Sequence, residues 1–189
     1  MEYQIILVVI ATVIGISSYI PYIKDIFTNK TKPHAFSWFI WGLLTAIAFA
    51  AQVKEGAGVG AWVAGFSAAM CLGISGIAFV RGNKHICRMD WFCLGAALLG
   101  IILWKITSNP LTAVVIVTLV DMIGFVPTFR KAYHHPHEET ALSFALSGIK
   151  WVFGLMALEV FNTTTTLYPA SLVLTNMVFV IMVLIRRRQ

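Results

Sequence analysis

The sequence predicts an all-α membrane protein with seven transmembrane helices. Of its 189 residues, 59% are hydrophobic and only 12% are charged, and the mean hydropathy is +0.83. A soluble monomer of this composition would precipitate. The second observation is that the apolar runs approach or reach the length of about twenty residues that a helix needs to cross a bilayer. The third is an internal repeat, which groups the predicted helices as 3+1+3.

Seven apolar runs define the predicted helices. They cover residues 4–23, 35–53, 59–80, 90–106, 111–129, 141–160 and 167–185. The fourth run is the weakest, because it is short and carries Lys105 near its end. The first run is long for the apolar part of a signal peptide and lacks a basic segment before it, so we expect it to be a retained helix. No soluble domain is expected, and the whole chain is predicted to be one membrane domain.

The basic residues gather on one side of the predicted membrane. When the loops are assigned alternately to two sides, one side receives eleven lysines and arginines. They are Lys24, Lys30, Lys32, Arg81, Lys84, Arg88, Arg130, Lys131, Arg186, Arg187 and Arg188. The other side receives Lys54 and Lys105, and Lys150 lies inside a helix. The positive-inside rule then predicts a cytoplasmic C-terminus and an outer N-terminus, and we expect a bacterial inner membrane. The net charge of +6 therefore reflects topology and does not indicate nucleic acid as a partner.

The chain repeats itself at an offset of 106 residues. The aligned identities are Thr12, Pro21, Ala35, Ser37 and Gly42 with Thr118, Pro127, Ala141, Ser143 and Gly148. In each half an apolar run ends in aromatic-x-Pro, a basic stretch follows, and Ala-x-Ser-aromatic opens the next run. This order predicts two three-helix repeats, residues 1–85 and 108–189, joined by a linker helix within 86–107. Because one linking span separates them, both repeats have the same orientation in the membrane.

The repeated turn also carries a family pattern. The first copy reads Ser18-Tyr19-Ile20-Pro21-Tyr22, then Lys24 and Lys30-Thr31-Lys32, then Ala35-Phe36-Ser37, and the second reads Phe125-Val126-Pro127, then Arg130-Lys131, then Leu142-Ser143. These motifs resemble the PQ-loop of the SWEET transporter superfamily. The family's glutamine is replaced by Tyr22 and Thr128, and its proline early in helices 2 and 6 is missing. The resemblance implies a divergent SWEET-like transporter that moves a small solute by alternating access.

Pro21 and Pro127 occupy equivalent positions near the cytoplasmic ends of the first and fifth predicted helices. A proline inside a helix removes one backbone hydrogen bond and clashes with the preceding turn. One interpretation is therefore a pair of hinges that let the cytoplasmic ends open and close. The alternative is that each proline simply ends its helix.

Asp121 and Lys150 are charges predicted to lie near the middle of the membrane. Asp121 lies some ten residues into its helix, or roughly 15 Å below the outer surface. Since a charge there is expensive and the two helices are consecutive, we expect an ion pair. It would anchor a substrate or make Asp121 a protonation switch for proton coupling. The alternatives are a structural clamp between the two helices, or a Lys150 side chain that extends elsewhere, towards the membrane surface. The first repeat has Gly15 and Leu44 at these positions, which favours an asymmetric or charged substrate over a simple sugar.

Three further residues complete the predicted substrate site. Asn176 lies near the position of a substrate-contacting asparagine in SWEET-like proteins, with interhelical hydrogen bonding as the alternative. Trp41 and Trp151 lie well inside their helices and are candidate pocket walls, with core packing as the alternative. Gln52 and Glu159 are predicted near the outer helix ends, where we expect them to be hydrated, with the lining of an outer vestibule as the alternative.

No catalytic motif, nucleotide-binding loop or metal motif appears in the sequence, so we expect no enzyme and no cofactor. The histidines around Pro136 are expected to form a solvated loop, and Cys71, Cys87 and Cys93 to be free thiols. Any transport is then facilitated or proton-coupled. The expected partners are a small-molecule substrate (a sugar, an amino acid or a vitamin-like metabolite) and the lipid bilayer, with a homo-oligomer left open. The alternative function is a receptor on the same fold that binds without transporting.

Overall fold

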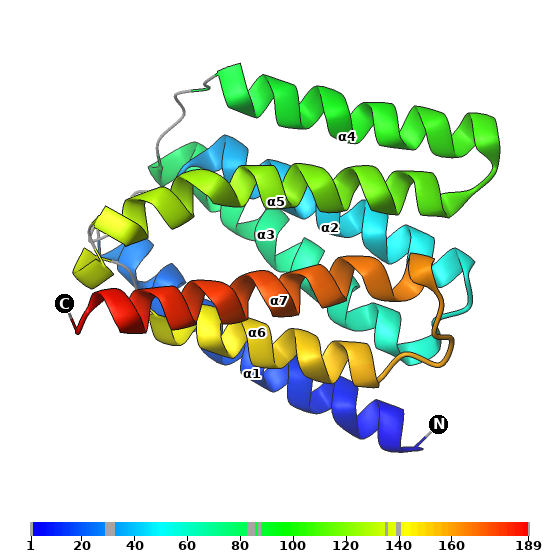
Figure 1. Ribbon diagram of the computed structural model, residues 1–189, viewed down its shortest axis with the longest axis horizontal. Helices are drawn as coiled ribbons and strands as arrows, with labels where there is room; N and C mark the ends of the chain where they lie inside the picture. Colours follow the sequence, from blue (N-terminus) through cyan, green and yellow to red (C-terminus); the bar gives the residue numbers. More distant parts are fainter. Residues whose placement is uncertain are drawn as a thin grey trace.

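The computed structural model describes residues 2–28, 33–82, 86, 88–134, 136–138 and 141–188, which form seven α-helices (Figure 1). They are α1 Glu2–Phe27, α2 Ala35–Lys54, α3 Trp62–Arg81, α4 Arg88–Thr107, α5 Pro110–His134, α6 Ala141–Met156 and α7 Thr163–Arg186, with short 3₁₀ turns η1 Gly58–Ala61 and η2 Pro136–Glu138. Six of the helices are long and apolar enough to cross a membrane. The predicted all-α architecture of membrane-length helices is thus confirmed at this level.

The exception is α6, which ends at Met156 rather than at residue 160 as predicted. Its 16 residues span about 24 Å, less than the roughly 30 Å of a hydrocarbon core. The helix ends because the following chain packs onto the connection between α2 and α3. The Glu159 N–H donates to the Ala57 carbonyl at 3.0 Å, and Leu158 is buried beside Ala57. A Cβ atom added at Gly60 would lie 2.5 Å from the Ala157 backbone, so only glycine admits this approach.

The two repeat prolines lie within helices. α1 continues to Phe27 and α5 continues to His134, so neither helix ends at position 21 or 127. The interpretation in which Pro21 and Pro127 terminate their helices is therefore wrong. The hinge interpretation stays a prediction.

A third proline, Pro169, lies inside α7 because this helix begins four residues earlier than predicted. Proline has no N–H, so the Thr165 carbonyl one turn earlier loses its helical donor. The side chain of Gln52 on α2 replaces that donor, with Nε2 2.8 Å from the Thr165 carbonyl oxygen. Gln52 is only 2% exposed, so the expectation that it is hydrated is wrong. Glu159, in contrast, is exposed.

The helices pack in two sets whose contacts mirror each other. In the first set α3 packs against both α1 and α2, and in the second α7 packs against both α5 and α6. Between the sets, α1 packs against α6 and α2 against α5, while α2 also contacts α7 and α3 contacts α6. If α1, α2 and α3 are exchanged for α5, α6 and α7, each of these contacts maps onto another. The remaining helix, α4, packs against α5 and α2 at the edge of the bundle (Figure 1).

The chain runs up and down through the bundle. α1 begins at one end and α7 finishes at the other, where α3 and α5 finish too (Figure 1). Basic residues of the last turns therefore gather at this end, namely Lys24, Arg81 and Arg186, and Arg130 lies just before the last turn of α5. Which side of a membrane this end faces stays a prediction from the charge distribution.

Candidate functional site

Lys150 on α6 lies inside the bundle with only 2% of its surface exposed. Its ammonium donates a hydrogen bond to the Ser67 hydroxyl of α3 at 3.0 Å, and that hydroxyl donates to the Val63 carbonyl at 2.8 Å. The Nζ atom also lies 4.7 Å from the ring centroid of Trp151 and 5.5 Å from that of Tyr19. An ammonium near aromatic faces is attracted by their quadrupoles. Among the residues that the structure describes, Lys150 is therefore held by one hydroxyl and two rings, and no carboxylate lies within ion-pair distance.

The stem of Lys150 depends on a glycine of α1. A Cβ atom added at Gly15 would lie 3.1 Å from the Cδ atom of Lys150 and 3.2 Å from the Phe66 ring. These distances are tighter than ordinary van der Waals contact. The absence of a side chain at Gly15 therefore leaves the space in which the lysine crosses from α6 towards α3.

Asp121 on α5 is also buried, with 5% of its surface exposed. The predicted ion pair with Lys150 is wrong, because their charged atoms do not approach within 4.0 Å. The reason lies in the packing order: α7, rather than α5, is the main neighbour of α6. Lys150 therefore faces the contact between α1 and α6, whereas α5 packs against α2 and α7. Although α5 and α6 are consecutive in the chain, they are not principal neighbours in the bundle.

The two charges still lie near a common region. Both act electrostatically on the thiol of Cys71, and Asp121 acts on the hydroxyl of Tyr168. The Tyr168 hydroxyl forms a hydrogen bond with the Thr45 hydroxyl at 3.0 Å, and its ring meets Trp151 edge-to-face at 6.1 Å between centroids. We call this group the central polar cluster. Its members are Tyr19, Thr45, Ser67, Cys71, Asp121, Lys150, Trp151 and Tyr168.

Two predicted site residues lie outside this cluster. Asn176 is 4% exposed and donates to the Leu172 carbonyl of its own helix at 2.7 Å, and its Cβ faces Gly148 where α6 and α7 meet. Trp41 is half-buried, and its ring packs edge-to-face on Trp38 at 5.4 Å. The structure therefore brings together Lys150 and Trp151, places Asp121 in the same region, and leaves Asn176 and Trp41 in packing contacts.

No family model, curated protein or solved structure matches this chain. The function therefore has to be inferred from the residues of the central polar cluster and from the packing of the helices.

Several members of the central polar cluster were not predicted from the sequence. Ser67 is one of many small polar residues in apolar helices, and such residues usually bond a carbonyl of their own helix, as Ser67 does. Tyr168 fell at the predicted start of the last helix, where tyrosine is typical of a membrane interface. The depth of Tyr168 became clear only when α7 was found to begin at Thr163, whereas Ser67 already lay inside the predicted helix 59–80 and its depth did not distinguish it from other small polar residues.

A second polar group lies at the basic end of the bundle. The Ser37 N–H donates to Nδ1 of His34 at 3.2 Å and the Ser37 hydroxyl lies 2.8 Å from it, so His34 caps the start of α2. Nε2 of His34 lies 3.9 Å from the Asp90 carboxylate on α4. This group connects the starts of α2 and α4.

Metal ligands do not cluster in the described part of the chain. No group of three or more His, Cys, Asp or Glu side chains there could hold a metal ion. Of the predicted solvated loop, His135 and Glu139 lie outside the described residues, whereas His134 and His137 are exposed.

Proposed function

We propose that the protein is a SWEET-like transporter that moves a small polar solute across a bilayer by alternating access. The observation that carries this proposal is Lys150, a buried charge at the contact between two sets of helices. Ser67 and Tyr19 belong to the first set, and Lys150 and Trp151 belong to the second. Charged residues inside membrane helices are expensive and usually mark a solute or ion pathway.

The proposed architecture is a parallel repeat, with residues 1–85 and 108–189 as three-helix units and α4, within 86–107, as the linker. Its support is the mirrored packing of α1, α2 and α3 against α5, α6 and α7. Two equivalent units that meet in this way have an approximate two-fold axis between them. Rocking about such an axis opens one side of the membrane while it closes the other.

The hydrogen bond from Lys150 to Ser67 connects the two units, so it must break when they separate. Among the described residues, only one of the three N–H donors of Lys150 is used in a hydrogen bond. A solute with a carboxylate or another strong acceptor can take up the remaining donors, and Trp151 can cover its apolar part. Pro21 and Pro127 would supply flexibility at the basic ends of α1 and α5. We further propose that Asp121 is the acid in proton coupling.

The test is solute binding followed by flux with the purified protein. A thermal-shift screen of sugars, amino acids and vitamin-like metabolites identifies a ligand, whose uptake is then measured in proteoliposomes. We expect Lys150→Met to lose uptake and Lys105→Met, at an exposed lysine, to retain it. Full uptake in Lys150→Met would contradict the proposed site. Binding without flux in the wild type would favour the receptor alternative.

Proton coupling needs a separate measurement. An imposed pH gradient should drive accumulation in the wild type, whereas Asp121→Asn should transport without responding to the gradient. Glu2→Gln, which neutralises an exposed carboxylate, is the control. An unchanged response of Asp121→Asn would exclude Asp121 as the coupling acid.

A further inference from the structure

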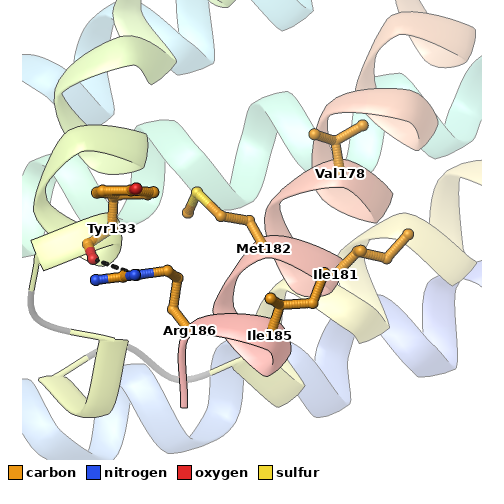
Figure 2. Close-up of a pocket in the computed structure, with 6 residues that line it drawn as sticks. All are labelled: Tyr133, Val178, Ile181, Met182, Ile185 and Arg186. Atoms are coloured by element: carbon orange, nitrogen blue, oxygen red, sulfur yellow. Dashed lines mark hydrogen bonds between the residues drawn. The ribbon is translucent and has the colours of Figure 1, made fainter. Parts of the chain in front are cut away.

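A groove on the outside of the bundle lies between the ends of α5 and α7 (Figure 2). Its volume is about 440 Å³. The residues that line it are Tyr133, Val178, Ile181, Met182, Ile185 and Arg186. The groove shares no residue with the central polar cluster, and the proposed transport does not use it.

One wall of the groove is an apolar stripe on α7. Val178, Ile181, Met182 and Ile185 follow the spacing i, i+3, i+4 and i+7, which places them on one helix face along about 10 Å of the axis. Three of them are between 45% and 53% exposed, so none of the described helices covers this face. In a membrane such a stripe is in contact with acyl chains.

The groove ends at a fixed cation. The Arg186 Nε atom donates to the Tyr133 carbonyl at 3.1 Å, and its guanidinium carbon lies 4.4 Å from the Tyr133 ring centroid (Figure 2). Arg186 is the last residue of a candidate membrane span. Arginine and tyrosine at the end of a span lie at the level of the lipid headgroups.

Further basic residues lie close to Arg186 in the sequence or on the neighbouring helix. Arg187 and Arg188 follow directly, and Arg130 lies one turn before Tyr133 on α5. Along the groove, an apolar stripe is followed by an aromatic ring and then by a guanidinium. A phospholipid has the complementary order: an acyl chain, a glycerol backbone and a phosphate. Basic pockets between transmembrane helices are suited to anionic headgroups, and arginine binds phosphate particularly well.

We propose that this groove binds one anionic phospholipid, with an acyl chain along the α7 stripe and the phosphate at Arg186. The stripe alone would accept the chain of any lipid. The guanidinium adds the preference for a negatively charged headgroup, and its fixed position determines where the phosphate lies.

Lipid competition on the full chain tests the proposal. The protein in neutral detergent is mixed with equal amounts of phosphatidylglycerol and phosphatidylcholine, and bound lipids are counted by native mass spectrometry. We expect the wild type to prefer phosphatidylglycerol and Arg186→Gln to reduce that preference about tenfold. Arg187→Gln is the matched control, because Arg187 also donates to a backbone carbonyl, that of Pro136 at 3.0 Å, but does not line the groove.

A second pair of variants tests the apolar wall. Met182→Trp should fill the groove and remove the bound lipid, whereas Leu184→Trp, at an exposed position of α7 outside the groove, should retain it. Thermal unfolding confirms that each variant is folded. Equal binding of the two lipids by the wild type would overturn the proposal. So would an equal loss in Arg186→Gln and Arg187→Gln, because that result indicates diffuse surface charge.

Discussion

At the scale of single residues, Lys150 combines a high desolvation cost with weak compensation. Its ammonium has one hydroxyl partner and two aromatic faces, although a charge at the centre of a membrane helix costs at least about 2.5–3.5 kcal/mol. Such a residue does little for folding, since an apolar side chain of similar length would fill the same space. The proposed function assigns this charge to solute binding.

This reasoning predicts that Lys150→Met does not destabilise the protein. Replacing a buried charge by a hydrophobic residue of similar volume is often neutral or stabilising. The midpoint of thermal unfolding in detergent should be equal to or higher than that of the wild type, and Lys105→Met should leave it unchanged. A clear fall in the midpoint of Lys150→Met would assign the lysine a structural role instead.

The sequence predicted the depth of the site residues better than their partners. The burial of Asp121, Lys150 and Trp151 followed from their distance to the helix ends. Their pairing did not follow, because hydropathy says nothing about which helices are neighbours. Ser67 could not be singled out, since a serine that bonds its own helix looks the same in sequence as one that also receives a lysine.

At the scale of helices, the most specific contact is that of Gln52 with the Thr165 carbonyl released by Pro169. This contact predicts that the effects of substitutions at Gln52 on α2 and Pro169 on α7 on stability are not additive. Gln52→Met should destabilise the wild type by about 1–3 kcal/mol, because Thr165 is fully buried and its carbonyl would lose its donor. In a Pro169→Ala background the restored N–H supplies that donor, so the same change should cost less. Thermal unfolding of the four proteins gives the coupling; strictly additive effects would contradict the prediction.

Two glycine-to-alanine variants test why α6 ends early. Gly60 contacts the chain that follows α6, and Gly73, on α3, is the control. Gly60→Ala should destabilise the protein, because its Cβ would lie 2.5 Å from the Ala157 backbone. Gly73→Ala should be neutral or stabilise by up to about 1 kcal/mol, since nothing lies within 4 Å of its Cβ and alanine is the better helix former. The midpoints of thermal unfolding of the two variants check this. A comparable fall in both midpoints would indicate that the close contact between Gly60 and the Ala157 backbone does not require glycine.

The positions of the helices were predictable, whereas two of their ends were not. Apolar length located all seven. The end of α6 depends on the contact of Leu158 with Ala57, and the start of α7 depends on the Asn162 cap, which accepts from the Thr165 N–H at 3.0 Å. Both are local or tertiary contacts that interrupt or extend a helix without changing the hydropathy around it.

At the scale of the whole molecule, the charge distribution predicts that the end of the bundle carrying Arg186 is cytoplasmic. A C-terminal fusion to green fluorescent protein should therefore fluoresce, and a C-terminal fusion to alkaline phosphatase should be inactive. Phosphatase inserted at Ser108, in the exposed turn between α4 and α5 at the other end, should be active. The opposite pattern would reverse the orientation.

The sequence predicts part of the grouping of the helices. The repeat predicts which helices are equivalent, and that equivalence stays a prediction; the contacts between helices support it under the proposed function. It did not predict that the third helix of each set packs against the other two. A single chain aligned with itself contains no information about which surfaces meet.

This packing order has a consequence for how the protein is made. A ribosome supplies helices in chain order, at about 5–20 residues per second. Because α3 packs against both α1 and α2, the first two helices lack their common neighbour until α3 is synthesised. In the same way, α5 and α6 lack theirs until α7 is synthesised. Lys150, however, enters a bilayer that already contains Ser67 and Tyr19. Synthesis thus delivers the costly charge only after its acceptor is in place, and a nascent chain interrupted before α7 would lack the common neighbour of α5 and α6.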